Sequence, residues 1–166
     1  MNGLHLIGDL SGCRCDPQLL LDSAGMKESC TRLVADAGLT VMDANFHQFE
    51  GGGFTGMVLL EETHLALHTW PERQGVTIDV YVCNYSGDNS DKAKKLFEGI
   101  VELFQPTEIA RHAVDRNEHL LMEPLNESTG FYIKAARQIG QWQTKFQKME
   151  IYDTPHYGRI FRLDGF

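Results

Sequence analysis

With 166 residues, of which 42% are hydrophobic and 23% are charged, the chain has the composition of a compact folded protein rather than a disordered one. Its formal net charge of −8, without any cluster of Lys and Arg, excludes the basic surface that nucleic acid or an anionic membrane would require. No apolar run approaches the roughly 20 residues that span a bilayer and the N-terminus lacks a basic leader segment, so we predict a cytoplasmic protein whose four cysteines, without a CxxC pair, are free thiols.

The pattern of apolar residues predicts a succession of strands and helices over the first two-thirds of the chain. Strands are expected over residues 4–10, 39–49, 56–60, 64–70, 76–83 and 108–114. Asp16 as cap and Pro17 as first helical residue begin a helical region whose clearest apolar stripe lies between residues 26 and 37. A further helix is expected from its cap, Ser90, to residue 104.

This order of elements predicts an α+β fold, a two-layer sandwich in which helices cover one face of a mainly antiparallel sheet. After about His119 the pattern changes, because residues 123–128 form a linker-like run. A β-hairpin follows, with strands over residues 149–152 and 159–163. We therefore predict two parts, the sandwich over residues 1–118 and a linker with a hairpin appendage over residues 119–166.

The dipeptide Glu62-Thr63 places a hydroxyl directly after a peptide carbonyl, between two predicted strands. Such a hydroxyl can attack that carbonyl, and the resulting ester can lose its acyl group by β-elimination, for which a base is required. Hydrolysis of the enamine then leaves an α-keto acyl group at a new N-terminus. His68 is the candidate base, and Thr55 can donate a hydrogen bond to the oxyanion of the attack.

His64 and His68 lie on one face of the predicted strand, which raises the question of a metal site. A metal would need a third ligand, and the chain has neither an HExxH run nor a Cys/His cluster at zinc spacing. We therefore predict no metal. The alternative is a pair of hydrogen-bonded histidines at a sheet edge.

A longer motif surrounds this dipeptide. The run LEETHLALHTWPE ends at Glu72 and is followed by Cys83 at the end of DVYVC, and it resembles the self-cleaving centre of prokaryotic S-adenosylmethionine decarboxylases. Their motif is similar to ESH, a short apolar strand, HTWPE, and a cysteine closing the next strand. Further matches are Gly3, His5, Gly12-Cys13 and the run NFHQF at residues 45–49. The resemblance covers roughly residues 1–115 and implies a homodimer.

The resemblance also implies roles for individual residues in catalysis. The α-keto group would form at position 63, His68 would assist processing, and Cys83 would return a proton after carbon dioxide leaves. Thr63 stands where the family has serine, so the group would be 2-oxobutyryl rather than pyruvoyl, and its methyl group restricts χ1. Thr55 likewise replaces a smaller hydroxyl residue. The alternative for Cys83 is a buried, inert thiol.

For substrate binding, the resemblance implies that Phe49 and Leu65 contact the adenine and that Glu72 accepts hydrogen bonds from the ribose hydroxyls. Phe49 and Leu65 can equally be core residues. The tail, over residues 146–165, resembles the opening hairpin of spermidine synthase, an enzyme that uses the decarboxylated product. A fused or associated spermidine synthase domain is therefore expected as a partner, although a generic hairpin is an alternative.

Three functions stay open from the sequence. The first is an S-adenosylmethionine decarboxylase, a carboxy-lyase of polyamine and spermidine biosynthesis that is made as a proenzyme and carries the covalent α-keto group as its cofactor. The second is an uncleaved homologue that binds S-adenosylmethionine or a partner domain without turnover. The third is decarboxylation of another amino acid on the same scaffold.

Overall fold

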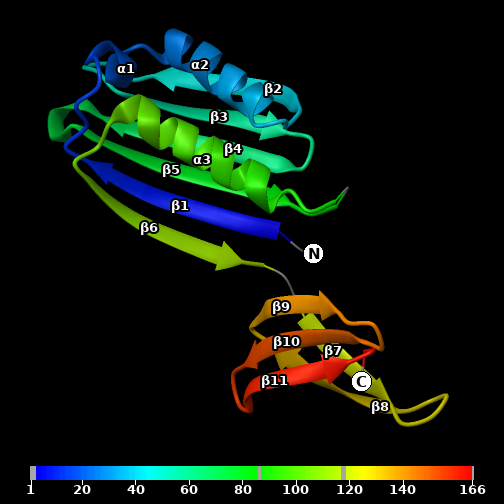
Figure 1. Cartoon of the computed structure of the whole chain (residues 1–166). Coiled ribbons are helices and arrows are strands. Elements are labelled where there is room, and N and C mark those ends of the chain that lie inside the picture. The colour runs from blue at the N-terminus through cyan, green and yellow to red at the C-terminus, as the bar shows by residue number, and fades with distance from the viewer. Residues whose placement is uncertain (1–2, 86, 117–118, 166) are drawn as a thin grey trace. The chain divides into compact units, whose positions relative to one another are not determined.

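The computed structural model describes residues 3–85, 87–116 and 119–165 and is drawn in Figure 1. The chain divides into two units, residues 1–116 and 117–166. The sequence predicts a division between residues 118 and 119, two positions later.

The first unit is built on a six-stranded sheet with the order β2-β3-β4-β5-β1-β6, in which every neighbouring pair is antiparallel. Its strands are β1 (Gly3–Ser11), β2 (Val41–Gln48), β3 (Phe54–Leu60), β4 (Thr63–Trp70), β5 (Gly75–Cys83) and β6 (Glu108–Asp115). Its helices are α1 (Gln18–Leu21), α2 (Ser23–Asp36) and α3 (Ser90–Phe104), with a 3-10 turn at Pro71–Arg73. Helices α2 and α3 lie on the same face of the sheet (Figure 1), which confirms the predicted fold class. In the part of the chain that the structure describes, no helix is long and apolar enough to cross a membrane.

The core lies between the sheet and the two long helices. On β5, the predicted alternation is confirmed, since Val76, Ile78, Val80 and Val82 are all buried. They pack in one cluster with the apolar stripe of α3, and burying each such side chain stabilises the fold by about 1.5–3 kcal/mol. The alternate side chains of the strands point to the opposite face of the sheet, which we call the open face. The candidate residues on alternate positions of β3, β4 and β5 therefore share one surface.

Two helix starts differ from the prediction. Pro17, not Asp16, occupies the N-cap position of α1, and Asn89, not Ser90, occupies that of α3. In the second case Asp88, Asn89 and Ser90 are successive residues of types that all favour this position, so their order alone cannot fix the start.

The second unit contains more strands than the sequence predicts. Strands β7 (His119–Pro124) and β8 (Gly130–Ala135) form one sheet, and β9 (Arg137–Gln143), β10 (Lys148–Thr154) and β11 (Gly158–Leu163) form another, in the order β11-β10-β9. The predicted hairpin is confirmed as β10 and β11. The predicted linker is instead the turn between β7 and β8, in which Asn126 Oδ1 accepts the N–H groups of Ser128 and Thr129, both at 2.9 Å. Asn, Ser and Thr favour tight turns for this reason, and such turns share their composition with linkers.

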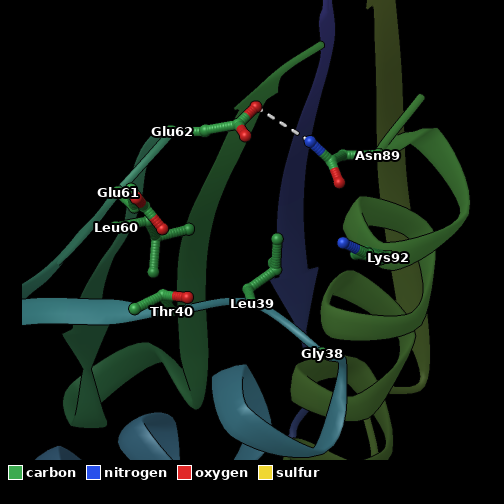
Figure 2. A pocket seen from close by; sticks show the side chains of 8 residues that line it. All are labelled: Gly38, Leu39, Thr40, Leu60, Glu61, Glu62, Asn89 and Lys92. Carbon is green, nitrogen blue, oxygen red and sulfur yellow. Dashed lines mark hydrogen bonds between the residues drawn. The ribbon is translucent and has the colours of Figure 1, made fainter. Parts of the chain in front are cut away.

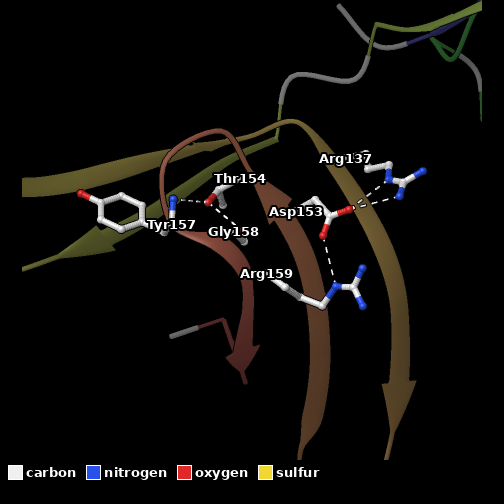
Figure 3. Close-up of polar contacts among 6 residues, drawn as sticks. All are labelled: Arg137, Asp153, Thr154, Tyr157, Gly158 and Arg159. Atoms are coloured by element: carbon white, nitrogen blue, oxygen red, sulfur yellow. Dashed lines mark hydrogen bonds and ion pairs between the residues drawn. The ribbon is translucent and has the colours of Figure 1, made fainter.

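Polar contacts connect the three strands β9, β10 and β11 (Figure 3). The Asp153 carboxylate on β10 accepts hydrogen bonds at 3.1 Å from Arg159 on β11 and from Arg137 on β9. These hydrogen bonds lower the pKa of Asp153 from its ordinary value. Beside them, the Thr154 hydroxyl donates to the Gly158 carbonyl at 2.9 Å and closes the hairpin turn. The contacts fix the register of the hairpin.

Truncation after Arg116 is expected to leave a folded first unit, because the whole α2, α3 and β-sheet core precedes that residue. Thermal unfolding of the truncated protein, followed by circular dichroism, should be cooperative, with a Tm within about 5 °C of the first unfolding step of the full chain. Truncation after Phe104 also removes β6 and serves as the disruptive control. Aggregation or non-cooperative melting of the longer truncation would contradict the expectation.

Candidate active site

The turn between β3 and β4 presents Thr63 in an uncommon backbone conformation. Glu61 and Glu62 form the turn, and Leu60 pairs with Thr63 across it. Thr63 has φ of 114°, in a region that a β-branched residue rarely adopts, and such a residue is strained by about 1–3 kcal/mol. Strain of this kind concentrates at functional sites, and here it falls on the residue that the sequence predicts to be the nucleophile.

The carbonyl that Thr63 would attack is already held by a hydrogen-bond donor. The Cys83 N–H donates to the Glu62 carbonyl oxygen at 3.1 Å. A donor in this position stabilises negative charge on that oxygen as a hydroxyl attacks the carbon. The sequence predicts Thr55 for this role, whereas Thr55 lies at the other end of β3 from the turn. The Thr63 hydroxyl itself donates to the Tyr81 carbonyl oxygen, so it must rotate about χ1 before it can reach the Glu62 carbon.

The Glu62 side chain is anchored on the helix side of the turn (Figure 2). Its Oε2 accepts hydrogen bonds from Asn89 Nδ2 at 2.8 Å and from the Tyr85 N–H at 3.1 Å, and the Cys83 thiol faces the same oxygen at 3.8 Å. We refer to Glu62, Thr63, Cys83 and Asn89 as the junction cluster. Sequence reasoning misses Asn89, which is 27 positions from Glu62 and belongs to no motif.

The four cysteines differ in their surroundings. All are free thiols, as the sequence predicts. Burial raises the pKa of Cys13 to about 11 and that of Cys30 to about 12, and it also raises the pKa of Cys15. Cys83 is half-buried and is the cysteine that contacts the predicted cleavage point.

His68 and Thr55 form a second group, at the opposite end of β4, which we call the distal cluster. Thr55 Oγ1 and His68 Nδ1 are hydrogen-bonded at 2.7 Å across β3 and β4. They border a cavity of about 370 Å³ that Asn45 and His47 also line. His68 follows Thr63 by five positions of extended strand, or about 16 Å at roughly 3.3 Å per residue. Within one chain His68 is therefore too far away to take a proton from Thr63.

Two further histidines of this face, His5 and His64, share one carboxylate partner. The Asp79 carboxylate lies between His5 Nε2, at 2.8 Å, and His64 Nε2, at 3.3 Å, and the Tyr81 ring packs against both imidazoles. His64 and His68 thus make separate contacts. Among the described residues, no group of three or more His, Cys, Asp or Glu is arranged to hold a metal ion.

The predicted substrate-binding residues are distributed over both faces. Leu65 is fully buried in the core, where its side chain packs beneath the helices and its backbone pairs with β3 and β5. Phe49 is 47% exposed and lies edge-on against His47, which borders the cavity of the distal cluster. Glu72 is exposed in the 3-10 turn after β4.

Comparison with known proteins gives a consistent result. The family described as S-adenosylmethionine decarboxylase matches residues 4–117. The S-adenosylmethionine decarboxylase proenzyme of Hydrogenobaculum is 36% identical over 114 residues, covering 69% of this chain and 81% of that protein. The arginine decarboxylase proenzyme of Ignicoccus hospitalis is 36% identical over 117 residues, covering 69% and 77%. The crystal structure of the adenosylmethionine decarboxylase from Aquifex aeolicus superimposes with a TM-score of 0.63 and 31% identity, covering 77% of this chain and 96% of that one. The family match covers the six-stranded sheet and the run LEETHLALHTWPE, and the solved structure has the same fold. The chain therefore belongs to the S-adenosylmethionine decarboxylase family.

Proposed function

We propose that this chain is a self-processing S-adenosylmethionine decarboxylase, a carboxy-lyase whose α-keto group arises by cleavage between Glu62 and Thr63. The observation that carries the proposal is the hydrogen bond from the Cys83 N–H to the Glu62 carbonyl, directly before a strained hydroxyl residue. A polarised carbonyl next to an internal nucleophile is what an acyl shift from nitrogen to oxygen requires.

Self-processing proceeds through chemistry of the chain itself. The Thr63 oxygen attacks the Glu62 carbonyl carbon, the bond from that carbon to the Thr63 nitrogen breaks, and an ester links the two residues. A base then removes the α-proton of Thr63, and Glu62 leaves as a carboxylate that carries the ester oxygen. Water hydrolyses the resulting enamine, which releases ammonia and leaves a 2-oxobutyryl group. The Cys83 N–H assists the first step, because negative charge develops on the oxygen that it already contacts.

Decarboxylation uses groups of the junction cluster together with residues at the distal end of the sheet. The α-keto group would supply a carbonyl for the substrate amine and an electron sink for the loss of carbon dioxide. The Cys83 thiol returns a proton to the α-carbon from its place beside the junction. Phe49 and Glu72, both exposed at the same end of the sheet as His68, contact the adenine and the ribose hydroxyls of a substrate bound at the junction of the partner subunit.

The working form in this proposal is a homodimer in which His68 acts on Thr63 of the partner subunit. Two observations support it: the separation of His68 from Thr63 along β4, and exposed apolar side chains on the uncovered face, among them Met57, Leu59 and Trp70. A two-fold axis perpendicular to β4 brings the open faces of two copies together with their β4 strands in opposite directions. The distal cluster of one copy then faces the junction cluster of the other.

A second candidate substrate is arginine, because the relative from Ignicoccus hospitalis is as similar to this chain as the relative from Hydrogenobaculum. Release of labelled carbon dioxide from S-adenosylmethionine and from arginine, measured side by side on cleaved protein, distinguishes the two. The place in polyamine biosynthesis, with an associated spermidine synthase domain, rests on the resemblance of residues 146–165. An intact chain that binds S-adenosylmethionine without releasing carbon dioxide would favour the non-catalytic alternative.

Replacing Thr63 with Ser is expected to accelerate cleavage roughly tenfold, because serine lacks the methyl group that restricts χ1 and limits rotation of the hydroxyl onto the Glu62 carbon. Fragment masses followed over hours give the rate. Thr63→Ala, which has no hydroxyl, should remain intact and is the control. A folded Thr63→Ser protein that stays a single chain would refute self-processing on this scaffold.

Replacing Cys83 with Ala is expected to retain cleavage and lose most decarboxylation. The reason is that its backbone N–H, which Ala keeps, contacts the Glu62 carbonyl, whereas the thiol supplies the later proton. Fragment masses and labelled carbon dioxide release, measured on the same sample, separate the two steps. Unchanged turnover accompanied by a large drop in Tm would assign Cys83 to packing instead.

Mixing two inactive variants tests whether the base comes from the partner subunit. A Thr63→Ser/His68→Ala chain and a Thr63→Ala chain should each remain intact alone, since one lacks the base and the other the hydroxyl. When they are co-expressed with different tags, the first chain should be cleaved in mixed dimers and the second should not. Absence of cleavage in a mixture shown to contain mixed dimers would mean that His68 does not act across subunits.

A further inference from the structure

Asn89 occupies the N-cap position of α3 without capping the helix. An asparagine there usually accepts an N–H of the first helical turn through its side chain, and Asn89 makes no such bond. Its Nδ2 instead donates to Glu62 Oε2 at 2.8 Å and to the Cys83 carbonyl oxygen at 3.1 Å. The residue is only 4% exposed. The buried side-chain amide of Asn89, at the start of α3, therefore binds Glu62 in the turn between β3 and β4 (Figure 2).

The start of α3 is served by a different residue. Asp88 Oδ1 accepts the Ser90 N–H at 2.9 Å, and hydrogen bonds from the Ser90 side chain and from this N–H lower the pKa of Asp88. The Asn89 N–H is in turn held by Asn84 Oδ1 at 3.0 Å. The Asn89 side chain is therefore not needed to cap α3, while the Asn89 backbone is held in place by Asn84.

Asn89 connects the two residues that define the cleavage point. Glu62 supplies the carbonyl to be attacked, and Cys83 supplies the N–H on that carbonyl oxygen. The Asn89 side chain donates to the carboxylate of Glu62 and to the backbone carbonyl of Cys83. The Tyr85 N–H is a further donor to the Glu62 carboxylate. Movement of either residue would lengthen the bond between the Cys83 N–H and the Glu62 carbonyl.

We propose that Asn89 is a positioning residue for self-processing, which keeps Glu62 and Cys83 together so that the Cys83 N–H stays on the scissile carbonyl oxygen. The inference rests on the proposed cleavage between Glu62 and Thr63 and adds to it a residue from outside the motif. Because Asn89 contacts the Glu62 side chain rather than the scissile peptide, its contact persists after the bond breaks and holds the new chain end in place.

The decisive variant is Asn89→Asp, made in the Thr63→Ser protein. It keeps the shape of the side chain and a residue type favoured at helix starts, but it turns a carboxylate toward the Glu62 carboxylate. Cleavage should slow about tenfold, a factor that the loss of one hydrogen bond to a charged group can produce. Asp91→Asn, which changes an exposed carboxylate in the first turn of α3, is the matched control and should cleave at the parent rate.

Exchanging the amide and the carboxylate between Glu62 and Asn89 distinguishes a positioning role of Asn89 from a general contribution to the stability of the fold. In Glu62→Gln/Asn89→Asp, the new amide can donate to the new carboxylate, so cleavage should be faster than in Asn89→Asp alone. A residue that merely stabilises the fold would show no such recovery. Asn89→Ser, which retains a capping residue but is too short to reach Glu62, replaces Asn89→Asp if the latter does not fold.

Hydrogen exchange of the Tyr85 amide provides a measurement that does not depend on cleavage. Its N–H is held by Glu62 Oε2, so in the uncleaved Thr63→Ala protein Asn89→Asp should accelerate its exchange while the amides of α3 remain protected. Faster exchange in the Thr63→Ala protein, together with a folded Thr63→Ser protein that never cleaves, would uphold the positioning role and reject the proposed function. Unchanged Tyr85 exchange, or unchanged cleavage in the Thr63→Ser/Asn89→Asp protein, would overturn the inference.

Discussion

The hydrogen bond from the Cys83 N–H to the Glu62 carbonyl is the contact on which the site depends, and it exists because of strand register. Thr63 stands opposite Val82, so the peptide before Thr63 meets the peptide after Val82. A shift of one residue would exchange the faces of β4 and remove this contact, and the buried valines of β5 prevent it. The same register fixes His68 at the far end of β4. One constraint thus assembles the junction and separates it from its candidate base.

Alternation with a period of two makes much of this fold predictable. Residues 76–83 alternate so regularly that both the span of β5 and its buried face follow from the sequence. The same rule puts His64 and His68 on one face and Leu65 on the other, hence in the core. A family resemblance carries no information on which part of a residue meets the substrate. For Leu65 strand parity alone therefore indicates that its side chain serves packing.

Prediction fails where polar residues carry the structure. The sequence RQIGQWQ forms β9 with little apolar alternation, because its pairing with β10 rather than a buried face defines it. Asp88, Asn89 and Ser90 are all common at helix starts, and which side chain turns toward Glu62 depends on the distance between α3 and the β3–β4 turn. That distance is a property of the packed sheet and helices, and no local pattern encodes it.

At Thr63 two effects of similar size oppose each other. The φ of 114° raises the energy of the intact chain by about 1–3 kcal/mol and favours reaction. The hydroxyl is held by the Tyr81 carbonyl, a bond worth about 0.5–1.5 kcal/mol that must break first, and the methyl group limits the rotation. Since neither effect clearly prevails, the rate depends on how well the Glu62 carbonyl is oriented and polarised. That task belongs to the Cys83 N–H and to Asn89, so threonine chemistry at this turn depends on contacts that lie outside the cleaved dipeptide.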